Sequence, residues 1–379
     1  MKDRLLFKSV KDDLAKKIVL LTGPRQSGKT TFAKQITKQV DYLNYDNAQH
    51  KIRISKGEWD RKQELIIFDE LHKMQNWKLF LKGIYDVDGI PPALFVTGSS
   101  KLDVFRKVGD SLAGRFFRYR MHPFDLKEVY QQFDLSADEL LNRLLEVGNF
   151  PEPFIEGKGS FYNRWKKNHM NIILRQDLID LSLIQDIPKL EHLIELLKHR
   201  VGSTISYSNL ARDIEKDSNT VKRWIQLLEN LYIIFRVSPY TKNVARSLLK
   251  ESKYYFYDVG QVIGEPQKLE NIVACALLKA GHFLEDTQGL EASLHFLRTK
   301  EGKEIDFAVV LDKQVTRLIE VKQTDTSLVP AFNHFLPMFP CAKGFQLVKN
   351  TSRNTSFSNG CRLEKLADWL CEVDILTTN

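Results

Sequence analysis

A glycine-framed loop between a short apolar run and a helical pattern constrains this chain more than any other feature. Residues 17–21 read KIVLL, residues 23–31 read GPRQSGKTT, and residues 32–36 read FAKQI. This order of strand, loop and helix, with GxxxxGK[ST] spacing, lets backbone N–H groups surround phosphates, and the dipole of the following helix adds to the attraction. The pattern therefore predicts a nucleotide-binding α/β domain with a parallel sheet.

The residues of this loop have separable roles in such a site. We expect Lys29 to act as a catalytic residue on the β- and γ-phosphate oxygens, and Thr30 to bind Mg²⁺. ATP and Mg²⁺ are therefore the predicted cofactors. The predicted nucleotide contacts are Gly23, Pro24, Arg25, Gln26, Ser27, Gly28, Lys29, Thr30 and Thr31.

Two later apolar runs end in polar residues that belong to the same predicted site. Residues 65–68 (LIIF) precede Asp69 and Glu70, as in a buried parallel strand whose carboxyl end meets the phosphates. We expect Asp69 to hold Mg²⁺ through water and Glu70 to orient or deprotonate the attacking water. Residues 93–96 precede TGSS at 97–100, where Ser99 is a candidate sensor of the γ-phosphate, although this is also ordinary turn sequence.

The middle of the chain has a helical pattern with one basic face. Apolar residues at three- and four-residue spacing over residues 123–189 predict a helical lid. Short helices at 208–215 and 218–228 then predict a helix-turn-helix, and the strand-like residues 232–237 would form the wing of a winged-helix domain. Such domains contact DNA but also serve as protein–protein modules. The predicted DNA contacts on the open face of the second helix are Asn219, Lys222, Arg223 and Gln226.

Two alternating segments near residue 313 predict a β-hairpin with paired acids. Residues 304–311 (EIDFAVVL) and 315–322 (VTRLIEVK) are joined at 312–314. With Lys313 at the centre, Asp306 lies opposite Glu320, and Glu304 lies opposite Lys322 on the same face. Opposed carboxylates repel each other unless a positive charge lies between them, and a divalent cation would supply that charge. The residues expected on the core side are Ile305, Phe307, Ile319 and Val321.

Several strings together carry a family resemblance. GPRQSGKTT, LIIFDELHK, FVTGSS and SLAGR (residues 111–115) resemble a family of prokaryotic AAA-type ATPases whose C-terminal domain is similar to restriction endonucleases. Residues 148–152 (GNFPE) are similar to that family's Gly-Gly-Phe/Tyr-Pro-Glu turn, with Asn149 in place of the second glycine. The resemblance covers nearly the whole chain. It implies that Arg115 is an arginine finger acting within a homo-oligomer, whereas a solvated basic strand with Arg118 and Arg120 is the alternative.

The hairpin itself resembles the PD-(D/E)xK nucleases, which place an acid on one strand and Glu-x-Lys on the next. This resemblance implies that Asp306 and Glu320 bind a second Mg²⁺ or Mn²⁺ together with the Val321 carbonyl, and that Lys322 positions the attacking water. Glu270 matches the helical acid of that fold. The alternative is an inactive scaffold in which Lys322 pairs with Glu304.

Composition sets the outer limits on the function. The 379 residues carry a net charge of +8, which permits contact with a polyanion such as DNA but does not establish it. The chain starts with mixed charge and has no apolar run approaching about 18 residues, so we expect a cytoplasmic protein without membrane contact. The four cysteines lie in the last third without zinc-site spacing, so no disulfide framework or structural zinc is predicted.

These patterns together predict an α/β protein with four parts. They are a P-loop ATPase core of the AAA type at 1–125, a helical lid at 126–195, a winged-helix domain at 196–245, and a PD-(D/E)xK nuclease-like α/β domain at 246–379. The function that follows is ATP hydrolysis coupled to the handling of DNA, with metal-dependent cleavage left open. The alternative is a nucleotide-dependent switch that signals or assembles with protein partners and carries an inactive nuclease-like domain.

Overall fold

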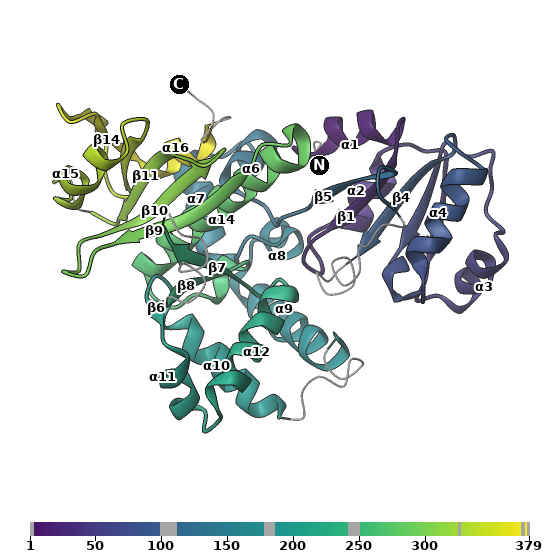
Figure 1. Cartoon of the computed structure of the whole chain (residues 1–379), viewed down its shortest axis with the longest axis horizontal. Helices are drawn as coiled ribbons and strands as arrows, with labels where there is room; N and C mark the ends of the chain where they lie inside the picture. The colour runs from purple at the N-terminus through teal and green to yellow at the C-terminus, as the bar shows by residue number, and fades with distance from the viewer. Residues whose placement is uncertain are drawn as a thin grey trace. The chain divides into compact units, whose positions relative to one another are not determined.

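The computed structural model (Figure 1) divides the chain into two compact units. One comprises Met1–Pro123 with the short segment Asn230–Tyr232, and the other comprises Phe124–Glu229 and Ile233–Asn379. No helix of the described residues is both long enough and apolar enough to cross a membrane. The structure describes residues 4–98, 112–177, 186–241, 251–324, 327–372 and 376.

The described residues of the first unit form a five-stranded parallel sheet in the order β2-β3-β4-β1-β5. Every residue of β1 and β3 is buried, as expected for strands that helices cover on both faces. Because β4 lies between β1 and β3, the loops after these strands meet at one edge of the sheet. The strands are β1 (Ile18–Thr22), β2 (Val40–Asn44), β3 (Leu65–Asp69), β4 (Ala93–Gly98) and β5 (Phe116–Arg120).

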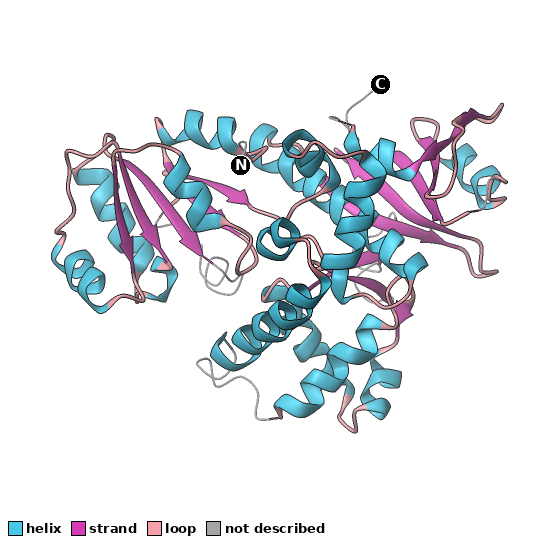
Figure 2. Ribbon diagram, turned by 180° about the vertical axis from the view of Figure 1, so that it is seen from behind, coloured by secondary structure: helices cyan, strands magenta, loops and turns pink. Residues whose placement is uncertain are grey.

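Helices pack on the two faces of this sheet (Figure 2) according to the alternation of side chains along the strands. On one face, Ile66 and Phe68 share a core cluster with Ile84. On the other face, the ring of Phe32 contacts that of Phe95, with centroids 6.3 Å apart. The helices are α1 (Phe7–Leu14), α2 (Lys29–Gln35), α3 (Ala48–Lys56) and α4 (Trp77–Val87), with a short 3₁₀ turn at Leu71–Lys73.

The second unit begins with helices. The helix that follows Ser136 has a reciprocal capping box, in which the Ser136 side chain and Glu139 bond to each other's backbone N–H groups. The helices are α6 (Leu126–Gln132), α7 (Ala137–Val147), α8 (Pro151–Glu156), α9 (Gly159–Ile172) and α10 (Ile187–Lys198), with a π-turn at Ile173–Asp177.

A mixed sheet follows, for which the described residues give the order β13-β14-β12-β11-β10-β9-β7-β8-β6. Its strands are β6 (Thr204–Ile205), β7 (Ile234–Pro239), β8 (Ser252–Phe256), β9 (Ala292–Arg298), β10 (Glu304–Leu311), β11 (Gln314–Lys322), β12 (Lys343–Val348), β13 (Thr355–Ser356) and β14 (Cys361–Lys365). The accompanying helices are α11 (Tyr207–Asp213), α12 (Ser218–Asn230), α14 (Glu265–Gln288), α15 (Ala331–Phe335) and α16 (Leu366–Cys371).

This sheet runs across the boundary that we placed at 245/246. Strand β7 lies in the predicted winged-helix segment and β9 lies in the predicted nuclease-like segment, yet the two strands pair in parallel, with Ser238 opposite His295. The segments assigned to a lid, a winged helix and a nuclease-like domain thus belong to one compact unit. Periodicity identifies a strand but not its neighbour, so sequence reasoning had no means of finding this pairing.

The β10–β11 hairpin has the predicted register over most of its length. Phe307 lies opposite Ile319 and Val309 lies opposite Arg317, which agrees with pairing about Lys313. A bulge between Val309 and Val310 then shifts the register by one residue. The turn is also shorter than expected: only Asp312 and Lys313 have positive φ, at 45° and 68°, and β11 already begins at Gln314.

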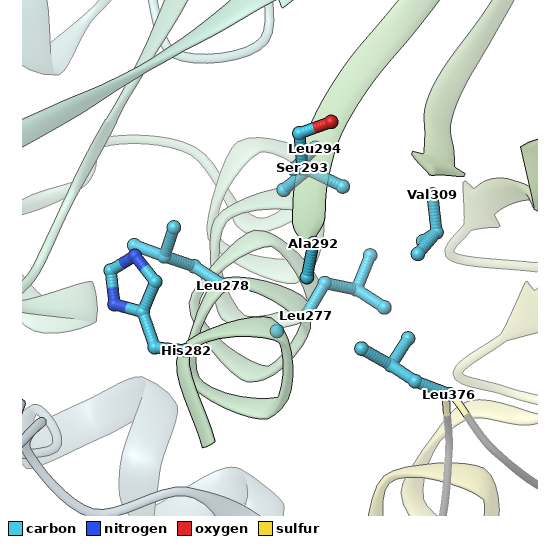
Figure 3. Close-up of a pocket in the computed structure, with 9 residues that line it drawn as sticks. Leu277, Leu278, His282, Ala292, Ser293, Leu294, Val309 and Leu376 are labelled. Atoms are coloured by element: carbon cyan, nitrogen blue, oxygen red, sulfur yellow. The ribbon is translucent and has the colours of Figure 1, made fainter. Parts of the chain in front are cut away.

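The long helix α14 packs along the sheet and contacts β8, β9, β10 and β11. Near its C-terminal half, a pocket of about 40 Å³ lies against β9 and β10 (Figure 3). This volume admits a few water molecules at most. It is too small for a nucleotide or a base. The lining residues include Leu277, Gly281, Ala292, Val309 and Leu376.

The GNFPE turn joins the helices of the second unit to the segment before α14. The Asn149 side chain accepts a hydrogen bond from the Val259 N–H at 3.1 Å, and its carbonyl accepts one from the Phe124 N–H at 2.8 Å. Next to this turn, the Tyr162 hydroxyl donates to the buried Asp258 carboxylate at 3.0 Å. The Asn149 side chain thus ties this turn to the segment before α14.

The buried Asp258 makes stability depend on pH. Burial raises the pKa of Asp258 from 3.8 to about 6, although hydrogen bonds, from Tyr162 first, oppose the rise. Between these values the folded protein binds a proton that the unfolded chain does not. The parent should therefore gain stability relative to Asp258→Asn as the pH falls through this window, by at most about 3 kcal/mol. Urea unfolding at about pH 7.5 and about pH 5 measures the difference. Parallel profiles for the parent, Asp258→Asn and the exposed control Asp134→Asn would contradict this account.

Candidate nucleotide site and carboxylate cluster

The loop between β1 and α2 has a conformation that depends on its two glycines. Gly28 caps α2 with a φ of 95°, a region that side chains with Cβ rarely adopt. Gly23 has a φ of 153°, and a Cβ at this position would collide with the carbonyl oxygen of Met121. Both glycines are therefore required where the motif places them.

Lys29 directs its ammonium group into the curve of this loop. The side chain is buried, and Nζ donates to the carbonyl oxygens of Gly23 at 2.8 Å and Pro24 at 2.6 Å. These partners are neutral, so the positive charge of Lys29 is not cancelled by them. The loop thus presents a buried cation, backbone N–H groups and a helix N-terminus at one point, which suits an anionic phosphate.

Asp69 is the meeting point of several elements at this edge of the sheet. Its Oδ2 accepts hydrogen bonds from Thr30 Oγ1 at 3.0 Å and from the Tyr42 hydroxyl at 2.5 Å, and its Oδ1 accepts one from Thr97 Oγ1. Burial, together with the bond to Asp69, raises the pKa of the Tyr42 hydroxyl. The hydroxyl of Thr30 beside a carboxylate is the oxygen donor set that Mg²⁺ uses in P-loop proteins, so the residues fit this ion.

The structure places the remaining predicted residues of this site as follows. Glu70 follows β3 in a left-handed conformation, with φ 55°, and its Oε2 lies 3.5 Å from Nε2 of His72. Arg115 forms a paired contact with Asp86, with Nε–Oδ1 at 2.6 Å and Nη2–Oδ2 at 3.1 Å. Ser99 lies outside the described residues.

Sequence reasoning missed three residues that support the nucleotide site. Tyr42 and Thr97 both bond Asp69, and only Thr97 had a signal, since it begins the TGSS string after β4. The third is Arg4, whose buried guanidinium donates to the carbonyls of Ser27 at 3.2 Å and His122 at 2.6 Å. It ties the P-loop to the segment after β5.

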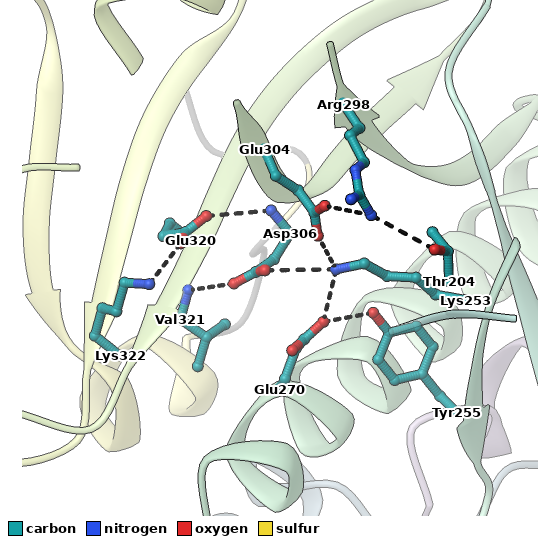
Figure 4. Close-up of polar contacts among 10 residues, drawn as sticks. All are labelled: Thr204, Lys253, Tyr255, Glu270, Arg298, Glu304, Asp306, Glu320, Val321 and Lys322. Atoms are coloured by element: carbon teal, nitrogen blue, oxygen red, sulfur yellow. Dashed lines mark hydrogen bonds and ion pairs between the residues drawn. The ribbon is translucent and has the colours of Figure 1, made fainter. Parts of the chain in front are cut away.

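A second polar cluster lies in the second unit (Figure 4) and contains the predicted nuclease-like residues. The Asp306 N–H donates to Glu320 Oε2 at 3.2 Å, and the Val321 N–H donates to Asp306 Oδ2 at 3.0 Å. Lys322 lies 2.8 Å from Glu320 Oε1 rather than pairing with Glu304 as the scaffold alternative expected. The predicted hairpin therefore does bring Asp306, Glu320 and Lys322 together.

The positive charge between the acids of this cluster is Lys253. Its Nζ lies 2.7 Å from Glu304 Oε1, 3.2 Å from Glu270 Oε1 and 3.6 Å from Asp306 Oδ1. Among the described residues, no group of three or more acidic, histidine or cysteine side chains is placed to hold a metal ion. One weak sequence signal pointed to Lys253, which is a lysine within the otherwise aromatic run KYYFY.

The open face of α12 is placed as the residue pattern predicted. Val221, Trp224 and Ile225 are buried. Exposed residues of the same helix are Asn219, Lys222, Arg223 and Gln226. Arg223 Nη2 donates to Thr220 Oγ1 at 3.1 Å.

Family models match three successive parts of the chain. Residues 15–130 match the model described as an AAA domain. This segment contains the P-loop, Asp69 and Glu70. Residues 138–263 and 267–365 match two domains of unknown function, DUF8612 and DUF4143. The fold and site of the first unit therefore define a P-loop ATPase domain of the AAA type.

Proteins named only as uncharacterized are similar to most of this chain. An uncharacterized protein of Mycobacterium tuberculosis is 25% identical over 320 residues, covering 82% of this chain and 71% of the relative. One from Methanocaldococcus jannaschii is 22% identical over 330 residues, covering 77% and 72%. Among solved structures, the Thermotoga maritima RuvB Holliday junction branch migration motor aligns with 62% of this chain and 86% of its own, at 16% identity and a TM-score of 0.30. That score is too low to support a shared function.

Lys29 and Glu70 should affect different steps at the nucleotide site. Lys29→Ala should weaken ATP binding roughly tenfold to hundredfold, because hydrogen bonds to a charged group contribute about 1.5–3 kcal/mol. Glu70→Gln should retain binding but slow hydrolysis on the order of 10²–10⁴-fold, as expected for loss of a general base. Calorimetry with a non-hydrolysable analogue and phosphate release measure the two effects, with the exposed Lys38→Ala as control. Undiminished hydrolysis by Lys29→Ala would refute the assignment.

Proposed function

We propose that this chain binds ATP with Mg²⁺ at the P-loop, hydrolyses it, and couples hydrolysis to the handling of DNA. The observation that carries the nucleotide part is the meeting of Lys29, Thr30 and Asp69 at one edge of a parallel sheet. The AAA domain match over the same residues supports it. The DNA part rests on the exposed face of α12.

Each residue of the nucleotide site has a defined task in this proposal. Lys29 exchanges its bonds to two carbonyl oxygens for bonds to phosphate oxygens, which are stronger because both partners are charged. Thr30 and Asp69 are the residues that would hold Mg²⁺, Asp69 through water, and the bound ion would supply positive charge to the phosphates. Glu70 orients the attacking water and accepts its proton.

The α11–α12 pair supports the DNA part of the proposal. From α10 to β8 the elements run helix, strand, two helices, and two antiparallel strands, the order of a winged-helix domain. The second helix of such a pair enters the major groove. Its start is fixed by Asp217, whose carboxylate accepts bonds from the Thr220 N–H at 2.9 Å and hydroxyl at 2.6 Å. In this proposal Lys222 and Arg223 contact phosphates and base edges.

A nucleotide-dependent switch with protein partners is the rival proposal. The same exposed side chains would then contact an acidic protein surface, and ATP turnover would not respond to DNA. Hydrolysis measured alone, with single-stranded DNA and with double-stranded DNA separates the two proposals.

Reversing the charge of the α12 face should weaken DNA binding without unfolding the protein. In Lys222→Glu/Arg223→Glu, the slope of log affinity against log salt should fall in magnitude by about 2, because each neutralised phosphate contributes roughly 0.9. The matched control is Arg164→Glu/Lys167→Glu, which makes the same charge change at two exposed positions of α9. Fluorescence anisotropy over a salt series measures both. Equal DNA affinity in the parent and a folded α12 variant would assign this face to protein contacts.

A homo-oligomer follows from the AAA-type site, in which a neighbouring subunit supplies an arginine. Arg115 is the candidate. It must leave Asp86 to reach a neighbour's γ-phosphate, and the short bond between them holds the pKa of Asp86 below its ordinary value. Both side chains of the Arg115–Asp86 ion pair are partly exposed to solvent. Separating them to contact a neighbouring subunit therefore costs less than separating a buried pair would.

A subunit-mixing experiment tests the arginine finger. Arg115→Ala subunits with an intact P-loop should be inactive alone and regain activity with Lys29→Ala subunits, which supply Arg115. Asp86→Asn, which breaks the same ion pair but keeps the arginine, should retain turnover. If Asp86→Asn is as inactive as Arg115→Ala, or mixing within a demonstrated oligomer gives no rescue, Arg115 is a structural residue.

Metal-dependent cleavage by the second unit is not part of this proposal. Asp306, Glu320 and Lys322 come together, which is the observation in its favour. The residues as placed do not fit a divalent metal ion, because the ammonium of Lys253 lies among the same carboxylates.

A further inference from the structure

Lys253 is a lysine that the fold buries almost completely. It lies on β8, every residue of which is buried, and its side chain is 1% exposed. Burying an ammonium group is costly unless opposite charges and hydrogen bonds compensate it. The compensation here comes from three acids of other elements. Burial alone would lower the pKa of Lys253, but Glu270, Asp306 and Glu304 outweigh it and raise the pKa.

The four carboxylate oxygens of Asp306 and Glu320 already have partners. Asp306 directs Oδ1 toward Lys253, while its Oδ2 accepts the Val321 N–H. Glu320 divides its two oxygens between Lys322 and the Asp306 N–H. A metal ion would have to displace these contacts to gain oxygen ligands at about 2.0–2.6 Å.

Glu270 and Glu304 complete the surroundings of the ammonium. Glu270 Oε1 also accepts the Tyr255 hydroxyl at 2.7 Å. Glu304 Oε2 lies 3.5 Å from Arg298 Nη1, and Oε1 is the closest oxygen to Lys253. In Figure 4 the Lys253 side chain enters from one side of the cluster and ends between carboxylates of α14 and β10. The sequence alone predicted a divalent cation between Asp306 and Glu320, whereas the ammonium contacts Asp306 together with Glu270 and Glu304.

We infer that the ammonium of Lys253 is the resident cation of this carboxylate cluster and excludes a divalent metal ion from it. The cluster then joins β8 to α14 and β10 electrostatically and holds no metal ion. Removing the ammonium while keeping the acids should open a site for Mn²⁺, because the acids remain in place and lose their compensating charge. This inference is independent of the proposed ATP hydrolysis.

Mn²⁺ binding to the full chain without nucleotide, measured by electron paramagnetic resonance, tests it. The parent should show no Mn²⁺ signal that depends on Asp306. Lys253→Met should bind Mn²⁺ at least about tenfold more tightly than the parent, since a like charge within a few Å of the ion has been removed. Mn²⁺ should also raise the Tm of this variant. Both gains should be lost in Lys253→Met/Asp306→Asn, which distinguishes the cluster from the nucleotide site.

Two controls separate the charge of Lys253 from the loss of any lysine. Lys253→Arg keeps the charge and should not gain Mn²⁺. Lys349→Met removes a lysine that pairs with Glu265 at 2.6 Å outside the cluster, and it also should not gain Mn²⁺. A folded Lys253→Met that binds no more Mn²⁺ than the parent overturns the inference.

If Lys253→Met does not fold, Mn²⁺ binding by the parent and by Asp306→Asn tests the inference instead. Mn²⁺ binding by the parent that disappears in Asp306→Asn would mean that metal displaces Lys253, and the inference falls. Equal Mn²⁺ binding by the parent and Asp306→Asn supports it. Neither result bears on the proposal that the first unit hydrolyses ATP.

Discussion

A buried charge needs partners, and this constraint determines how the polar residues of both units are arranged. Asp69 collects hydroxyl groups from Thr30, Tyr42 and Thr97, so that α2, β2 and β4 are fixed around the end of β3. Asp258 accepts the Tyr162 hydroxyl beside the GNFPE turn. Since burying an unpaired charge costs several kcal/mol, each such group holds in place the elements that supply its partners.

The features that could be predicted from the sequence are those set by local pattern. The P-loop follows from a fixed spacing within nine residues, and its glycines have the conformations that the motif requires. The hairpin register follows from two-residue alternation, which is why Phe307 is correctly opposite Ile319. The register fails only toward the turn, where a bulge and two residues with positive φ shorten the loop.

The features that could not be predicted depend on residues distant in the chain. Tyr42 lies 27 residues from the carboxylate that it contacts, and nothing in its own strand indicates that partner. Lys253 lies within an aromatic strand that periodicity assigns to a core. The pairing of β7 with β9 joins segments that look like separate domains in sequence. In all three cases the role of the residue or strand depends on a tertiary contact that its local sequence does not indicate.

Two buried lysines, Lys29 and Lys253, show why the same side chain has different consequences at different sites. Lys29 donates to the carbonyl oxygens of Gly23 and Pro24, which are neutral and do not cancel its positive charge. Lys253 lies among the carboxylates of Glu270, Glu304 and Asp306, so its charge is already neutralised within the protein. Neutral partners prepare a cation for binding phosphate, whereas acidic partners make it part of the scaffold. The sequence places a lysine at both positions, and only the partners distinguish a binding residue from a structural one.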